Sequence, residues 1–158
     1  MMSSRISGAT MDRRIPVLAA LAALSACNLP AADKESDGIA RAFYGEIRSG
    51  ADLSRDPHVD PSLATAQAQA TLAGVRAWAP GAKPTQIQNS GWSYNTNAGQ
   101  GTQAQLSHTY VYPGATVHVQ TVMRKLPGQS AWTIIGFTAN TDSGAPVAVG
   151  APPKSSDE

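Results

Sequence analysis

The sequence predicts an α+β domain in which N-terminal helices pack on one face of a curved, antiparallel, four-stranded meander. Two observations carry this prediction. Apolar residues recur at helical spacing up to Trp78, and beyond Pro80-Gly81 they alternate with polar residues at a period of two. Gly- and Pro-containing turns separate the alternating runs. Helices followed by hairpins are typical of α+β domains, whose helices cover one face of the sheet.

The first helix is expected to begin near Ser36 and to end at Gly50. Ser36 has a side chain that can cap a helix, and Asp37 suits the positive end of the helix dipole. Gly50 supplies the left-handed conformation that often follows a helix. The apolar stripe of this helix comprises Ile39, Ala40, Phe43, Tyr44 and Ile47.

A second helix is expected from Ser62 to Ala79, because this stretch is rich in Ala, Gln and Leu. Its spacing gives a face of mostly small residues, with bulkier side chains beside it. The small-residue face comprises Leu63, Ala66, Ala70, Ala73 and Ala77, and Leu72, Val75 and Trp78 add bulk.

Four strands follow, with β-branched and aromatic residues at alternate positions. Pro113-Gly114 predicts a tight turn between the second and third strands, and Leu126 to Gln129 predicts another before the fourth. The strands are expected at Thr85 to Thr96, Thr102 to Tyr112, Thr116 to Lys125 and Trp132 to Phe137.

The first 26 residues have the pattern of a secretory signal peptide. Arg13 and Arg14 precede an uncharged apolar run of ten residues, 15–24. Such a helix rises about 15 Å, half of the roughly 30 Å hydrocarbon thickness of a bilayer, and is too short to span it. Leu24-Ser25-Ala26-Cys27 resembles the bacterial lipobox, and Cys27 is the only cysteine of the chain.

The lipobox resemblance implies cleavage before Cys27, acylation of this residue, and attachment to the membrane through the acyl chains, palmitate among them. The protein would face the periplasm from the cell envelope. In enteric lipoproteins, an Asp directly after the lipid-bearing Cys resembles a signal for retention in the inner membrane. This chain has Asn28 at that position, so the sequence favours the outer membrane. A plain secretory signal that contains a cysteine, and a buried apolar helix, are the alternatives. Met11 is an alternative start to Met1 or Met2.

Composition divides the remaining chain into three parts. Residues 27–35 have the composition of a short tether, and residues 36–141 hold the foldable domain. Residues 142–158, with several Pro and Gly and a polar end, are expected to form a disordered tail.

The domain resembles the nuclear transport factor 2-like (NTF2-like) superfamily of cone-shaped α+β folds. The resemblance lies in the opening helix Ile39-Ala40-Arg41-Ala42-Phe43-Tyr44, the helical stretch before Pro80, and the closing strand Trp132-Thr133-Ile134-Ile135-Gly136-Phe137. It implies a helix-covered cone and, since many cones pair through their sheets, a homodimer. A cystatin-like or PepSY-like helix-on-sheet domain is the alternative.

Charge excludes several function classes. Twelve Lys and Arg balance eleven Asp and Glu, so no basic stripe for nucleic acid is expected. The stretch from Pro61 to Thr141 contains no Asp or Glu, so the strands cannot supply a carboxylate base.

The histidines His58, His108 and His118 share no metal-ligand spacing, and a zinc site assembled across strands is the alternative. No catalytic residue, metal or cofactor is assigned. His58 and His118 are expected to face solvent.

Five residues are candidates for lining a pocket inside the cone. They are Trp92, Tyr94, His108, Tyr110 and Tyr112. If they form an open, aromatic-lined space, they suit a small apolar ligand, whereas aromatic residues on a sheet more often form the core.

We therefore expect a non-catalytic, lipid-anchored domain that binds a small ligand or an envelope protein. The alternative is an NTF2-like enzyme that uses His108 and tyrosine hydroxyls on a small apolar substrate. A purely structural envelope component is a third hypothesis.

Overall fold

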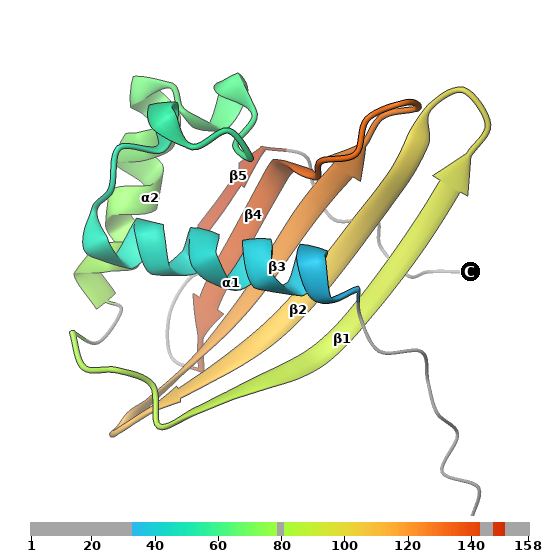
Figure 1. Ribbon diagram of the computed structural model, residues 1–158. Coiled ribbons are helices and arrows are strands. Elements are labelled where there is room, and N and C mark those ends of the chain that lie inside the picture. Colours follow the sequence, from blue (N-terminus) through green and yellow to red (C-terminus); the bar gives the residue numbers. More distant parts are fainter. Residues whose placement is uncertain (1–32, 79–80, 143–146, 151–158) are drawn as a thin grey trace, which may run out of the picture.

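The computed structural model describes residues 33–78, 81–142 and 147–150. Two α-helices and two 3-10 turns precede a sheet of five strands, arranged in the order β1-β2-β3-β4-β5 with antiparallel neighbours (Figure 1). The elements are α1 (Lys34–Ser49), η1 (Leu53–Arg55), η2 (Pro61–Leu63), α2 (Ala66–Trp78), β1 (Gln86–Asn97), β2 (Gly101–Tyr112), β3 (Ala115–Lys125), β4 (Thr133–Thr141) and β5 (Val147–Gly150).

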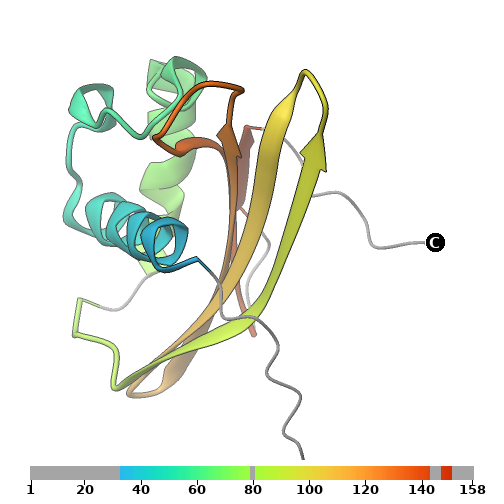
Figure 2. The same ribbon diagram turned by 45° about the vertical axis from the view of Figure 1, so that its right-hand side comes forward.

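The sheet is curved, and both helices lie against its concave face (Figures 1 and 2). Helix α1 crosses the strands, and α2 packs beside β5. No helix of the described residues covers the opposite face, which we call the outer face. These features confirm the α+β prediction and the placement of the helices on one face.

The sheet has five strands, so the prediction of four was wrong. The additional strand, β5, lies in the segment 142–158 that was expected to be a disordered tail, and it pairs with β4 from Ala139 to Gly136. The strand has only four residues and is flanked by Pro and Gly, so the local sequence pattern does not indicate a strand. It is stabilised by pairing with β4. Residues 151–158 lie outside the described residues.

Helix α1 buries the predicted stripe, with Ala40, Phe43, Tyr44 and Ile47 at most 2% exposed. It ends at Gly50, whose φ of 75° confirms the predicted left-handed terminus. The start differs from the prediction. Asp33, not Ser36, caps the helix by accepting a hydrogen bond from the Ser36 N–H at 3.2 Å. Three residues of the predicted tether are therefore ordered in or beside α1.

Helix α2 is shorter than predicted, because η2 and a break precede its start at Ala66. Its buried face is formed by Ala68, Leu72 and Val75. The larger apolar side chains gain more from burial and so decide which side faces the sheet. The alanines of the predicted small-residue face are exposed: Ala66, Ala70, Ala73 and Ala77.

Aromatic side chains fill the space between α1 and the sheet. Phe43 meets Phe137 edge to face at 5.5 Å between ring centroids, and Tyr44 lies 4.3 Å from Tyr110. Each buried aromatic ring of this kind contributes on the order of 2–3 kcal/mol through burial alone.

Among the described residues, no helix has the length and apolar character needed to cross a membrane.

Candidate functional site

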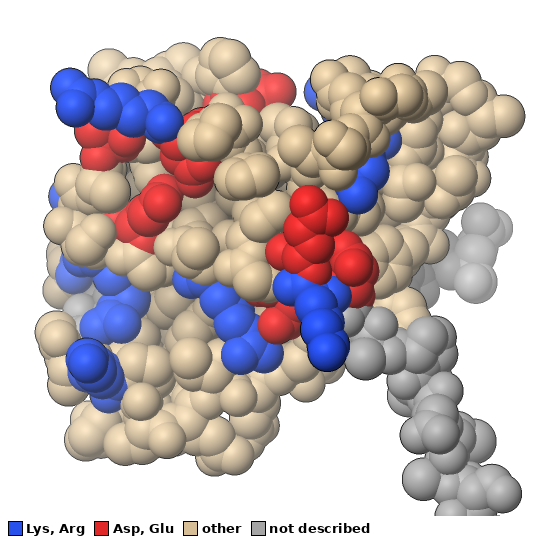
Figure 3. All heavy atoms as spheres, in the orientation of Figure 1, with Lys and Arg blue, Asp and Glu red and all other residues tan. Residues whose placement is uncertain are grey.

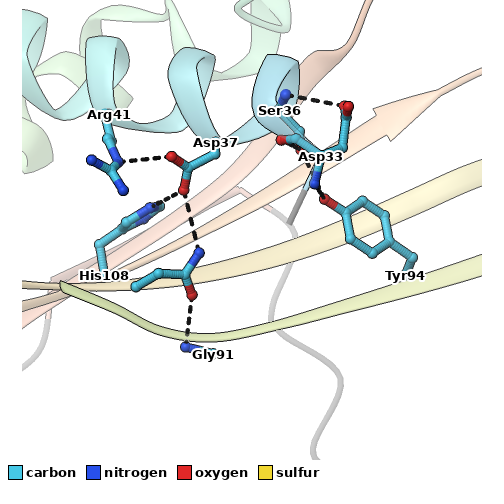
Figure 4. A network of polar contacts seen from close by, with 8 residues as sticks. Asp33, Ser36, Asp37, Arg41, Gly91, Tyr94 and His108 are labelled. Atoms are coloured by element: carbon cyan, nitrogen blue, oxygen red, sulfur yellow. Dashed lines mark hydrogen bonds and ion pairs between the residues drawn. The ribbon is translucent and has the colours of Figure 1, made fainter. Parts of the chain in front are cut away.

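The candidate site is a hydrogen-bonded carboxylate–imidazole pair between α1 and β2 on the concave face. Strand alternation turns His108 inward between Leu106 and Tyr110, where it is 1% exposed. Helix α1 places Asp37 directly opposite, and Nε2 of His108 lies 2.7 Å from Oδ1 of Asp37 (Figure 4). This distance is that of a charge-assisted hydrogen bond.

Two further side chains hold the Asp37 carboxylate. Arg41, one helical turn later, places Nε 2.9 Å from Oδ2. Asn89 on β1 donates through Nδ2 to Oδ1 at 3.3 Å and accepts from the Gly91 N–H at 3.1 Å, across the bulge in β1 (Figure 4). The carboxylate thus connects α1 to both β1 and β2.

Sequence reasoning missed this pair. The prediction that the strands supply no carboxylate base holds, but α1 brings one to His108 from 71 residues away. A signal was present, because Asp37, Ala40 and Tyr44 follow at i, i+3 and i+7 and so share one helix face. A carboxylate on a buried face needs a polar partner.

A second cluster fixes the start of α1 to the sheet, and we call Asp33, Ser36, Tyr94 and Trp132 the N-terminal clamp. Tyr94 Oη accepts from the Asp33 N–H at 2.9 Å and lies 2.8 Å from Ser36 Oγ. Ser36 Oγ donates to the Asp33 carbonyl at 2.9 Å, and Trp132 Nε1 donates to Asp33 Oδ2 at 3.3 Å. Asp33 is thereby held by strand β1 and by the turn between β3 and β4.

The structure brings the five predicted pocket residues together on the concave face. His108, Tyr110 and Tyr112 are at most 3% exposed and are packed within the core. Trp92 and Tyr94 are partly buried and pack against it, with their ring centroids 5.5 Å apart. The predominant role of these side chains is therefore packing under α1.

Some buried polar atoms at this site have no hydrogen-bond partner among the described residues. They include Nδ1 of His108 and Oη of Tyr110. Burial raises the pKa of Tyr110 well above its ordinary value, so its hydroxyl stays protonated. The arrangement therefore offers an imidazole nitrogen beside a neutral phenol.

Hollows of about 410, 210 and 180 Å³ among the described residues are lined mainly by side chains of the outer face, with His108 also lining the second and Tyr94 the third. Amide and hydroxyl side chains such as Asn95, Gln103, Gln105 and Ser107 line them. His118 points to this face, as predicted, and its side chain is 47% exposed. Its Nε2 lies 3.0 Å from Asp142 Oδ1, and its Nδ1 lies 3.2 Å from Thr109 Oγ1.

His58 is half-buried, in contrast to the predicted exposed position. Its backbone N–H donates to Asp56 Oδ1 at 2.8 Å, and its ring Nδ1 lies 3.0 Å from the carbonyl oxygen of Trp132. Burial is the main cause that raises the pKa of the nearby Glu46 above its ordinary value, and the Asp56 carboxyl is the second cause.

The described part of the chain holds no group of three or more metal-ligating side chains.

Cys27, the predicted lipid-attachment residue, lies outside the described residues. Comparisons with protein-family models, with curated proteins and with solved structures gave no match to the chain.

Proposed function

We propose that this chain is a bacterial lipoprotein that is acylated on Cys27, anchored in the outer membrane and exposed to the periplasm. Its NTF2-like domain is a non-catalytic module that binds an envelope protein through the outer face of the sheet. The sequence Leu24-Ser25-Ala26-Cys27 supports the anchor, and two helices on a curved antiparallel sheet support the fold assignment.

One observation carries the binding role: among the described residues, polar side chains of the outer face supply most of the lining of the hollows, whereas aromatic side chains fill the concave face. An enzyme with its site inside the cone needs room for a substrate beside His108. Here His108 is 1% exposed, and α1 lies over it. No helix of the described residues covers the outer face, so a partner can reach it.

The lining of the hollows favours a hydrogen-bonding partner over a small apolar ligand. In the two smaller hollows, whose lining does not include Leu126, Asn95, Gln103, Gln105 and Ser107 present donors and acceptors without charge. Protein surfaces provide matching groups, and interfaces of this kind carry roughly one hydrogen bond per 100–200 Å². An envelope protein therefore fits this face best.

Site-specific photocrosslinking in intact cells tests this proposal. A photoreactive amino acid at Gln105, on the outer face, should give a discrete adduct with one envelope protein. The same amino acid at Ala42, which is exposed on α1, is the control and should give none. Adducts from Ala42 alone, or from neither position, would contradict the proposed face.

The Asp37–His108 pair favours a second candidate function, an NTF2-like enzyme acting on a small apolar substrate. Asp37 orients the imidazole, and the unpaired Nδ1 of His108 could accept a proton if α1 moved aside. The variant His108→Gln keeps an amide donor near Asp37 but cannot act as a base at that position. Turnover that this variant abolishes without lowering the melting temperature would support the enzyme.

A further inference from the structure

We propose that the domain rests on the bilayer through one end of its sheet, with the side chain of Leu126 in contact with lipid. This end carries the β1–β2 turn (98–100) and the β3–β4 turn (126–132). The inference rests on the proposed acylation of Cys27 and adds to it an orientation, a contact residue and a partner, the phospholipid surface itself.

The length of the tether limits how far the domain can stand from the membrane. Asp33 follows Cys27 by six residues. Even a fully extended chain spans at most about 3.3–3.6 Å per residue, so Asp33 lies within roughly 20 Å of the anchored residue. A domain of about 110 residues has a diameter well above this reach, because its radius of gyration alone is about 13 Å. The side of the domain that carries Asp33 must therefore face the lipid.

The N-terminal clamp fixes which side this is. Trp132 in the β3–β4 turn donates to Asp33, and Glu35 lies 3.6 Å from Lys125 at the end of β3. Leu126 follows Lys125 directly, so the tether enters the domain beside the β3–β4 turn.

The β1–β2 turn belongs to the same end of the sheet (Figure 1). A Cβ atom at Gly101 would collide with the backbone of Lys125 and Leu126, which shows how closely the two turns pack. Both turns therefore belong to the end of the sheet at which the tether enters the domain.

Leu126 is suited to this contact because it is an exposed apolar side chain, 39% exposed. Among the described residues one other large hydrophobic side chain is exposed to this degree, Ile87 at 40%. Ile87 lies near the opposite end of the sheet, where β1 pairs with Tyr110. Transfer of an exposed leucine side chain from water into the acyl boundary is favourable, because it removes apolar surface from water.

The contact does not require anionic lipid. Figure 3 shows acidic and basic side chains next to each other at the start of α1. Lys125 Nζ lies 3.6 Å from Glu35 Oε2, and Lys34 stands between Asp33 and Glu35 in the chain, so these opposite charges largely cancel. The tether and the apolar side chain, rather than a basic patch, determine the orientation.

Lipid quenching of a fluorophore tests the proposal on the full mature chain. Leu126→Cys and the matched control Ile87→Cys each introduce the one free thiol, because acylation blocks Cys27. Each variant is labelled with an environment-sensitive nitrobenzoxadiazole dye and reconstituted in phosphatidylcholine vesicles, with and without phosphatidylglycerol. Brominated phosphatidylcholine then quenches dyes near the acyl chains.

We expect the emission at position 126 to fall at least about twofold with brominated lipid and to shift to the blue in both vesicle types. The emission at position 87 should change by less than about a tenth. Equal quenching at the two positions, or stronger quenching at 87, would overturn the orientation.

Mass spectrometry of the same samples distinguishes the failure of this inference from that of the proposed function. An acylated chain whose dye at position 126 is not quenched would contradict the proposed orientation but would agree with the proposed lipid anchor. A chain without acyl groups overturns both. Thermal melts that match the unlabelled protein show that each variant is folded.

Discussion

Nε2 of His108 on β2 lies 2.7 Å from Oδ1 of Asp37 on α1, so this hydrogen-bonded pair connects the first helix to the middle of the sheet. The histidine is buried, and the side chain of Asp37 is 21% exposed. In such a pair the loss of one partner costs more than the pair itself contributes, because the other group stays in a poorly solvated position. In the proposed function this contact positions α1 over the core.

His108→Ala should lower the free energy of unfolding by about 2–4 kcal/mol, because it leaves a cavity and removes the partner of Asp37. His118→Ala is the matched control, since His118 also contacts a carboxylate but is exposed on the outer face. Its loss should cost less than about 1 kcal/mol. Urea denaturation measures both values, and similar costs for the two variants would contradict the structural role of His108.

Tyr94→Phe should loosen the start of α1, because it removes the hydroxyl that contacts Asp33 and Ser36. We expect a loss of about 1 kcal/mol. Hydrogen exchange should accelerate several-fold at the amides of Ser36 and Asp37, while amides near Gly50 keep the wild-type rate. Uniform acceleration along α1 would show that the clamp does not act locally.

Glu46→Gln should raise the melting temperature at pH 7. The pKa of Glu46 is raised by burial and by Asp56, so its stabilising contribution is present below the unfolded pKa of about 4.5 and is lost as the pH rises through the folded pKa. The gain should be a few degrees at pH 7 and should vanish near pH 4. Calorimetry across this range measures it.

Asp60→Ala is the control for Glu46→Gln, because the pKa of Asp60 is shifted in the opposite direction and its variant should change the melting temperature with the opposite sign. Hydrogen bonds from Ser62 lower the pKa of Asp60, so its contribution is present at neutral pH and is lost as the pH falls through the folded pKa. This variant should therefore melt below wild type at pH 7. A gain that is independent of pH for Glu46→Gln would refute the electrostatic explanation.

Gly50→Ala should destabilise the domain by about 1–2 kcal/mol, because φ is 75° and a Cβ would approach Arg76. Gly45→Ala within α1 should instead stabilise it by about 0.5–1 kcal/mol, since no atom lies within 4 Å of the added methyl group. Thermal unfolding of the two variants should differ in sign. Equal shifts would contradict the described end of α1.

The sequence predicts those features that depend on local spacing. The stripe from Ala40 to Ile47 and the terminus at Gly50 follow from the helical period and from glycine's backbone freedom. The strands β1 to β4 follow from alternation, and their observed bounds differ from the expected ones by one residue in most places. The end of β4 is the exception, since pairing with β3 extends it to Thr141.

Features that depend on contacts between distant segments were missed. Strand β5 forms because β4 offers a free edge, which a local pattern rich in Pro and Gly cannot indicate. Asp33 replaces Ser36 as the cap because Tyr94 and Trp132 hold it in place. The Asp37–His108 pair joins a helix and a strand, and only helical spacing hinted at the buried side of Asp37.

Intact-mass analysis of the protein purified from bacterial membranes tests the central claim, lipid anchoring, most directly. We predict an amino terminus at Cys27 that carries a diacylglyceryl group and an additional acyl chain, with the Cys27→Ser variant unprocessed. A mature chain that begins elsewhere, or one that carries a free thiol at Cys27, would contradict the account.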